Sequence, residues 1–301
     1  FSTQRLTDEM KKLRRLPKGS MYRFVLRENF EDCDLTESNS KGVNLTIWEA
    51  PERGGMYVIG ADPAYGSSDW KDRFVASVWR CYGDGMVQVA EFCTDACSTY
   101  QFAWVILYLA GAYTVAEDPA SKSTVMLNLE INGPGQAVWA EMLNLKRTAG
   151  ASPHNPVSRK IMMVVRNLQN YLYKRLDTFG KPAAYHWQTT HNLKYRMLEF
   201  FRDCFERGTS IVNSTALIEE MQSVVRDDGE IGAPDRAKDD RVMAAGLAHV
   251  AWNDYMRMQA IQRGLLKPKP EGQESPMSGR VVQPPVSYAV KGMLARIGVK
   301  V

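Results

Sequence analysis

Three carboxylic acids lie at the ends of segments whose apolar character predicts buried elements. Asp62 ends the run "MYVIGAD", Glu130 ends "STVMLNLE", and Asp240 opens "DRVMAAGLAHVAW" directly after Asp239. Catalytic groups of α/β folds gather where strands end, and a helix packed on the sheet can bring a further acid there. Clustered carboxylates need compensating cations, and these hard oxygen donors suit Mg²⁺ or Mn²⁺ rather than zinc. Two such ions ~4 Å apart can activate a water molecule and stabilise the leaving oxygen of a phosphodiester.

Each acid also has a plainer interpretation. Asp62 precedes Pro63 and could simply start a turn. Glu130 could form an ion pair at a sheet edge, and Asp239 or Asp240 could cap a helix, where free backbone N–H groups attract acids. Any one of these interpretations is reasonable alone. It is less reasonable that all three acids, at three such positions, have no part in metal binding or catalysis, so we favour the metal site.

Strands and helices are expected to alternate around these acids. The runs "RFVASVWRCY" and "GMVQVAEFC" predict two strands after Asp62, joined by the turn signal "GDG". Helices are predicted at 98–113, 133–145, 161–176, 192–208 and 214–227, before the helix that Asp240 opens. A strand meander followed by mixed strand and helix units predicts an α/β protein with a mixed central β-sheet flanked by helices.

Composition and charge divide the sequence into three parts. The 301 residues are 45% hydrophobic and 24% charged, an ordinary globular balance. We expect residues 1–50 to lead in from a preceding domain, residues 51–263 to form the folded domain, and residues 264–301 to be a Pro-rich linker and basic tail. That tail holds six Lys or Arg and two Glu, which equals the whole net charge of +4. A neutral body binds DNA weakly unless a local patch, bound cations or another domain helps.

Cysteine usage and hydropathy indicate the compartment. The five cysteines are odd in number and scattered, which favours reduced thiols over disulfides or a zinc site. The longest apolar run, 102–113, is shorter than the ~20 residues that a membrane span needs. The charged N-terminal segment has no signal-peptide character. We therefore expect a cytoplasmic protein that is neither secreted nor attached to a membrane.

Four segments, in this order and spacing, carry a family resemblance: "YVIGADPAYG", "LNLEINGPG", "WQTTHNLKYRMLEFF" and "KDDRVMAAGLA". The set resembles the nuclease domain of the large terminase subunit of tailed bacteriophages, over roughly residues 50–255. The resemblance implies an RNase H/RuvC-like fold and an endonuclease that uses two divalent cations, Mg²⁺ or Mn²⁺. Such enzymes cut concatemeric viral DNA, with low sequence specificity, while the genome is packaged into procapsids.

The resemblance also assigns roles to residues of this sequence. Asp62, Glu130 and Asp240 match the catalytic metal ligands, and Asp239 is a neighbouring candidate. The sequence leaves open which of the two helix acids binds the metal. Many relatives carry a further acid one turn after this pair, where this sequence has Met243, so a fourth acid at that place is not expected.

The partners implied by the resemblance are double-stranded DNA, the terminase ATPase domain, the small terminase subunit, and the portal protein through the C-terminal tail. The site of action would be the host-cell cytoplasm, at the procapsid. No G-x-x-x-x-G-K-[ST] motif occurs, so we expect no nucleotide site in this chain. The ATPase motor would then lie outside it.

Four basic residues near the acids are candidates for contacts with DNA phosphates. Lys71 and Arg73 follow the first acid, and Lys194 and Arg196 stand early in the predicted helix 192–208. Such contacts position DNA without reading its sequence. Since most charged side chains merely face solvent, solvation is the alternative interpretation.

Two other functions remain open at this point. The chain could be another RNase H-like nuclease, such as a Holliday-junction resolvase, which a junction-cleavage assay would separate from a terminase nuclease. It could also be a non-catalytic module that docks on the portal, for which the basic end of the tail gives some support. Replacement of Asp62 by Asn would leave a docking module unaffected and would inactivate a nuclease.

Overall fold

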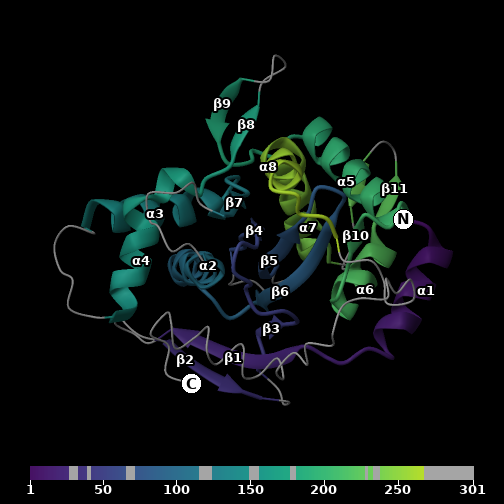
Figure 1. Cartoon of the computed structure of the whole chain (residues 1–301), viewed down its shortest axis with the longest axis horizontal. Coiled ribbons are helices and arrows are strands. Elements are labelled where there is room, and N and C mark those ends of the chain that lie inside the picture. Colours follow the sequence, from purple (N-terminus) through teal and green to yellow (C-terminus); the bar gives the residue numbers. More distant parts are fainter. Residues whose placement is uncertain are drawn as a thin grey trace.

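The computed structural model describes residues 1–26, 33–38, 42–65, 72–114, 124–148, 156–176, 181–227, 230–232 and 238–267. Its elements, drawn in Figure 1, are α1 (Thr3–Leu13), β1 (Ser20–Leu26), β2 (Cys33–Glu37), β3 (Leu45–Ile47), β4 (Tyr57–Asp62), β5 (Phe74–Cys81), β6 (Met86–Thr94), α2 (Thr99–Tyr113), β7 (Val125–Leu129), α3 (Pro134–Thr148), α4 (Pro156–Arg166), η1 (Leu168–Asn170), β8 (Lys174–Leu176), β9 (Pro182–Tyr185), α5 (His191–Glu206), β10 (Ser210–Ile211), α6 (Thr215–Ser223), β11 (Val225–Asp227), β12 (Glu230–Gly232), α7 (Asp240–Ala251), the π-helix η2 (Trp252–Met256) and α8 (Arg257–Gln262).

The central sheet has the strand order β2-β1-β3-β6-β5-β4-β7, and β10 pairs with β6. Strands β4, β5 and β6 form an antiparallel meander, with the predicted "GDG" turn between β5 and β6. Strand β7 returns parallel to β4 on its other side, after α2 has crossed the sheet. This mixed order confirms the predicted α/β class with a mixed central sheet flanked by helices.

Helices cover both faces of the sheet (Figure 1). One core lies under α2, α3 and α4 and contains Tyr57, Ile59 and Ala61 of β4. The other lies under α5, α6 and α7 and contains Met56 and Val58. Because successive side chains of a strand point to opposite faces, residues 58, 60 and 62 share the face that α7 covers.

The close approach of α7 to β4 depends on Gly60. A Cβ atom at this residue would lie 1.9 Å from the carbonyl oxygen of Ala244 and 2.7 Å from the amide nitrogen of Ala248. Both are backbone atoms of α7, so only a residue without a side chain permits the contact. The glycine thus brings the start of α7 close to the end of β4.

The first 50 residues contribute more structure than the sequence analysis expected. Strands β1, β2 and β3 all precede residue 50 and extend the central sheet beyond β6. The boundary of the folded domain at residue 50 stays a prediction. The tail beyond residue 267 lies outside the described residues, and the sheet gives no information about it.

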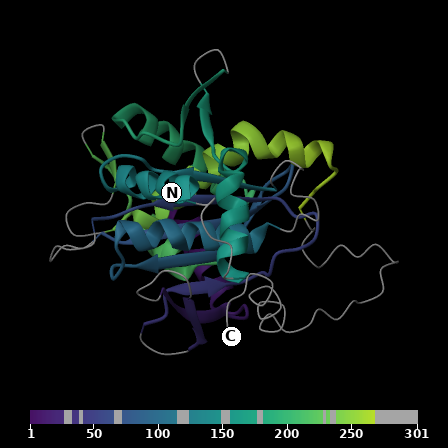
Figure 2. The ribbon, with the colours of Figure 1, turned by 90° about the vertical axis from the view of Figure 1, so that its left-hand side faces the viewer.

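One predicted helix is wrong in its extent. The helix expected at 161–176 is α4, which ends at Arg166, and the chain then forms η1 and the strand β8. Strands β8 and β9 pair as a hairpin that stands away from the body, as Figure 2 shows. After η1 the chain no longer follows a helix. Leu172 instead forms a parallel bridge with Leu127 of β7.

The last helical segment runs continuously from Asp240 through η2 to Gln262. Its far end is fixed to the β5–β6 turn. The indole nitrogen of Trp252 donates to the carbonyl of Tyr82 at 2.8 Å, and the amide of Gly83 donates to Leu265 at 2.8 Å. Among the helices that the structure describes, none combines the length and apolar character that crossing a membrane requires.

Candidate active site

Asp62 and Glu130 stand side by side at the ends of two parallel strands. Asp62 is the last residue of β4, and the amide of Glu130 donates to the carbonyl of Ala61 at 2.9 Å, one step beyond β7. Asp62 is buried, with 8% of its surface exposed. Burial, then the charge of Glu130 and a hydrogen bond between the two carboxyl groups, raise the pKa of Asp62 well above its usual range. This environment therefore favours the protonated form of Asp62.

Asp239 and Asp240 stand at the start of α7. Asp239 occupies the N-cap position, but its side chain makes no capping hydrogen bond and instead accepts one from Lys194 Nζ at 3.0 Å. The Oδ2 atom of Asp240 accepts from the backbone amide of Arg73 at 3.3 Å and from Arg73 Nε at 3.0 Å. Helix capping, the plainer interpretation of this acidic pair, is therefore not what either side chain does.

The four acids lie near one another. The charges of Asp240 and Asp239, after that of Glu130, also raise the pKa of Asp62. Burial raises the pKa of Asp240 as well, and Arg73 opposes that rise. The structure thus places the acids that the sequence analysis selected at two adjacent strand ends and at the start of the helix that packs on them.

This donor set consists of carboxylate oxygens, which are the ligands that hard divalent cations such as Mg²⁺ and Mn²⁺ prefer. Asp62 and Glu130 could hold such an ion, with Asp240 or Asp239 as a further ligand. In the part of the chain that is described, however, no three His, Cys, Asp or Glu side chains already converge on one point. The two helix acids face Arg73 and Lys194 instead.

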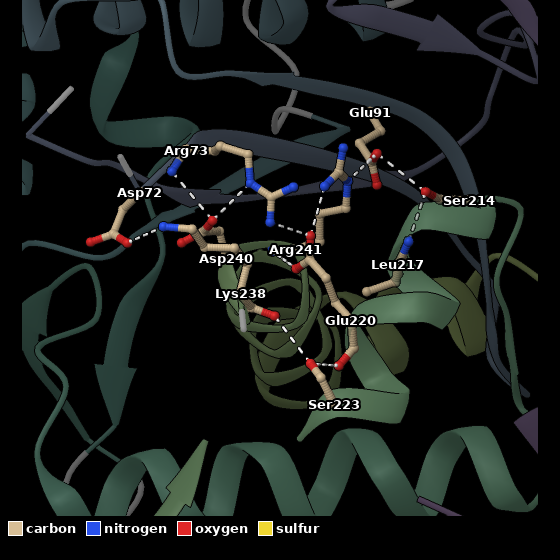
Figure 3. A network of polar contacts seen from close by, with 10 residues as sticks. All are labelled: Asp72, Arg73, Glu91, Ser214, Leu217, Glu220, Ser223, Lys238, Asp240 and Arg241. Carbon is tan, nitrogen blue, oxygen red and sulfur yellow. Dashed lines mark hydrogen bonds and ion pairs between the residues drawn. The ribbon is translucent and has the colours of Figure 1, made fainter. Parts of the chain in front are cut away.

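A buried ionic network lies directly beside Asp240 (Figure 3). Arg73 Nη2 donates to Glu220 Oε1 at 2.6 Å, and Arg241 Nη1 donates to the same atom at 2.6 Å. Arg241 Nε in turn donates to Glu91 Oε1 at 2.8 Å, and Ser214 Oγ donates to that atom at 3.2 Å. We call Arg73, Glu220, Arg241 and Glu91 the Arg–Glu network. It joins β5, β6, α6 and α7 beside the acids.

Sequence reasoning missed most of this network. Glu91 and Glu220 are both 7% exposed, although glutamates are almost never fully buried without a partner. Glu91 is a charged residue inside the apolar run "GMVQVAEFC", and this position was the available signal that its side chain is buried with a partner. Nothing local signals Glu220, because its two arginine partners come from distant elements.

The residue after β9 helps to place Glu130. His186 has a φ of 60°, a left-handed conformation that non-glycine residues rarely adopt. Burial lowers the pKa of His186 to about 3, so the ring is neutral, and its Nδ1 accepts from the amide of Leu129 at 3.4 Å. The turn directs Trp187 alongside Glu130, where the amide of Ile131 donates to the carbonyl of Trp187 at 2.9 Å. Backbone strain of this kind clusters at functional sites.

The four candidate DNA contacts have different surroundings. Arg73 and Lys194 are paired with the helix acids. Arg196 is exposed and, with Arg175, borders a cavity of about 870 Å³ between β8, α5 and η2. Lys71 lies outside the described residues. The role of all four in DNA binding stays a prediction.

Comparisons with known proteins yielded structural similarities only. No protein-family model matches the chain, and no curated protein matches it. The large terminase nuclease from thermophilic phage G20c with bound magnesium is similar at 16% identity, with a TM-score of 0.44, over 69% of this chain and 87% of that one. The nuclease domain of the large terminase from Thermus phage P74-26 is similar at 16% identity, with a TM-score of 0.41, over 68% of this chain and 84% of that one.

A third similar structure comes from a virus of another kind. The human cytomegalovirus terminase nuclease domain, soaked with manganese and bound to an inhibitor, is 12% identical, with a TM-score of 0.40, over 84% of this chain and 96% of that one. All three of these similar structures are nuclease domains of viral terminases.

Proposed function

We propose that this chain is a divalent-metal-dependent endodeoxyribonuclease, the nuclease part of a DNA-packaging terminase. One observation carries the proposal. Asp62 ends β4, and Glu130 stands beside it, one residue beyond β7, with its amide donating to the carbonyl of Ala61 at 2.9 Å. Asp239 and Asp240 stand at the start of α7, which packs closely on β4 at Gly60. Asp62 and Asp240 are buried, and buried carboxylates are costly unless cations neutralise them, which is a common reason for such an arrangement at a catalytic site.

The residues would divide the work as follows. Asp62 and Glu130, fixed by adjacent backbone, would hold a cation at the sheet edge, and Asp240 would complete its ligands from α7. When bound, a pair of Mg²⁺ or Mn²⁺ ions supplies an activated water and charge stabilisation for the leaving oxygen. Burial of Asp62 and the rigid contact of α7 at Gly60 would keep the carboxylates in place without reorganisation during the reaction.

The biological setting follows from the sequence resemblance and belongs to the same proposal. The substrate would be concatemeric viral DNA, cut with low sequence specificity during packaging in the host cytoplasm. The partners would be the terminase ATPase domain, the small terminase subunit, and the portal protein through the basic tail. The concentration of net charge in residues 264–301 supports a separate binding role for that tail.

Metal binding should raise the thermal stability of the protein. A ligand that binds only the folded state adds about 2.7 kcal/mol when its concentration is a hundredfold its Kd. We expect the melting temperature, followed by calorimetry, to rise by several degrees when MnCl₂ replaces EDTA, because the clustered acids lose their repulsion. The rise should disappear in Glu130→Gln. An equal rise in that variant would place the bound metal elsewhere.

Lys194 and Arg196 are expected to contact DNA phosphates beside the acids. Each phosphate contact adds roughly 0.9 to the slope of log affinity against log salt concentration. The variant Lys194→Ala/Arg196→Ala should therefore bind duplex DNA more weakly, with a slope shallower by about 2. Fluorescence anisotropy at several salt concentrations measures this slope. Lys11→Ala/Lys12→Ala, on the exposed side of α1, serves as the control with the same loss of charge. An unchanged slope in the α5 variant would remove both residues from the DNA path.

A further inference from the structure

Asp240, a candidate metal ligand, is paired with a cation of the protein itself. Its Oδ2 atom accepts both the backbone amide and Nε of Arg73. Asp240 is 7% exposed, and the side chain of Arg73 is 25% exposed, so solvent weakens this ion pair little. A cation near Asp62 that used this oxygen would therefore have to compete with the guanidinium.

Arg73 has a second carboxylate partner, which does not face the other acids. Its Nη2 donates to Glu220 Oε1 at 2.6 Å, and Glu220 is itself fixed by Arg241 through Nη1 at 2.6 Å and the backbone amide at 2.7 Å. Figure 3 shows Arg73 lying between the two acids, with one guanidinium edge on each. Arg73 can therefore leave Asp240 without becoming an unpaired charge.

Charge balance indicates which cation pairs with Asp240 before and after a metal binds. A buried carboxylate needs a cation, and breaking a buried pair by removing one partner costs several kcal/mol. In the absence of metal, Arg73 meets this need for Asp240. A divalent cation brings twice the charge to the same carboxylate, and its own charge repels a guanidinium held beside it. The two cations therefore exclude each other at this oxygen.

We propose that Arg73 is the internal counter-cation of Asp240 in the metal-free protein, and that a divalent cation displaces Arg73 from Asp240 while Glu220 retains it. This inference rests on the proposed metal-dependent function. It selects Asp240, of the two helix acids, as the one that exchanges Arg73 for a metal ion. It also gives Glu220 a specific role, which is to hold Arg73 after the exchange.

The exchange predicts opposite effects for two neighbouring substitutions. Arg73→Gln removes the competitor, so the affinity for Mn²⁺ should rise about tenfold, a change of the size that residues behind a metal ligand produce. Glu220→Gln removes the anchor and leaves Arg73 with Asp240 alone, so the affinity should fall about tenfold. In the double variant, Glu220→Gln should change the affinity less than twofold, because Arg73 is no longer there to be retained.

Calorimetric titration of the whole chain with MnCl₂ measures these affinities without relying on cleavage. Two controls remove the same charge without touching the exchange. Lys238→Gln deletes a cation two residues before Asp240 that is paired with Asp72. Glu91→Gln deletes the other buried carboxylate of the network, which binds Arg241 and not Arg73. Both should change the affinity less than twofold. Melting temperatures in EDTA establish that each variant is folded.

Several outcomes would overturn the exchange. Weaker Mn²⁺ binding by Arg73→Gln would mean that Arg73 supports the ligand and does not compete for it. Equal effects of Lys238→Gln and Arg73→Gln, or of Glu91→Gln and Glu220→Gln, would mean that general electrostatics suffices. If Arg73→Gln does not fold, the comparison of Glu220→Gln with Glu91→Gln decides the matter. Failure of the unaltered protein to bind Mn²⁺ would instead refute the proposed function itself.

Discussion

Asp62→Asn is expected to abolish metal-dependent DNA cleavage while leaving the metal-free protein at least as stable as the unaltered one. Loss of a metal ligand removes several kcal/mol of transition-state stabilisation, which corresponds to a fall in rate of roughly 10³-fold or more. The shape of the side chain hardly changes, and its neighbours Glu130 and Asp240 keep their charges.

The sign of the stability effect follows from the raised pKa of Asp62. Burial is the largest cause of that rise, followed by the charge and hydrogen bond of Glu130. The folded state therefore prefers the protonated carboxyl. Its stabilising contribution is complete below the unfolded pKa of about 3.9 and is lost as the pH rises through the folded value. At neutral pH the unaltered protein bears this cost, and the neutral Asn does not.

Plasmid cleavage with MnCl₂, and thermal unfolding in EDTA, test the two halves of this prediction. Asp203→Asn is a suitable control, because Asp203 is an acid on α5 with its side chain 50% exposed, outside the cluster. Cleavage that survives in Asp62→Asn would mean that Asp62 is not a required metal ligand. Absence of cleavage by the unaltered protein would instead favour a docking module. A marked loss of stability of the variant in EDTA at pH 7 would contradict the argument from buried charge.

Gly60→Ala should damage both folding and cleavage by displacing α7. The new methyl group would lie 1.9 Å from the carbonyl oxygen of Ala244, and no side-chain rotation can relieve contact with backbone. Overpacking of a core costs about 1–3 kcal/mol, and we expect a value at the upper end. Because α7 carries Asp240, its displacement should also slow cleavage, since a shift of about 1 Å can cost 10²-fold.

Chemical denaturation and plasmid cleavage of the same preparation measure both effects. Gly111→Ala is the matched control, because a Cβ atom at this residue of α2 would lie 3.7 Å from Val164 Cγ2 of α4, which is an ordinary contact. Alanine in a helix is favoured over glycine by up to about 1 kcal/mol, so this control should be stabilised and fully active. Normal stability of Gly60→Ala would show that α7 does not depend on this contact.

The grouping of the acids followed from local patterns, because strands that are buried on both faces are visible in a sequence as short apolar runs. Asp62 and Glu130 each end such a run, and the parallel pairing of β4 with β7 brings two like ends to one edge. Asp240 could be added because a charged residue at the start of a buried helix needs a polar or cationic partner nearby, and a metal site provides one. These arguments use neighbours within a few positions along the chain.

The partners of those acids could not be predicted in the same way. Arg73 meets Asp240 across 167 positions and Glu220 across 147, and spacing along a sequence gives no information about such pairs. Arg73 was expected to face DNA, on the basis of its loop position alone. Strands β1 and β2 were also missed, because residues 1–50 were expected to be a lead-in and the pairing of these strands extends a sheet whose other strands come later in the sequence.

The attachment of the last helical segment has a mechanical consequence. From Asp240 to Gln262 the helix is 23 residues long, which at 1.5 Å per residue makes a rod of about 34 Å. Beyond its far end, Lys267 donates to Asp84 Oδ1 through its amide at 2.7 Å and to the carbonyl of Gly208 through Nζ at 2.7 Å. Tension applied to the chain after Lys267 would act on these two hydrogen bonds before it acted on the helix. Such a load would reach the start of α7 only after both hydrogen bonds had broken.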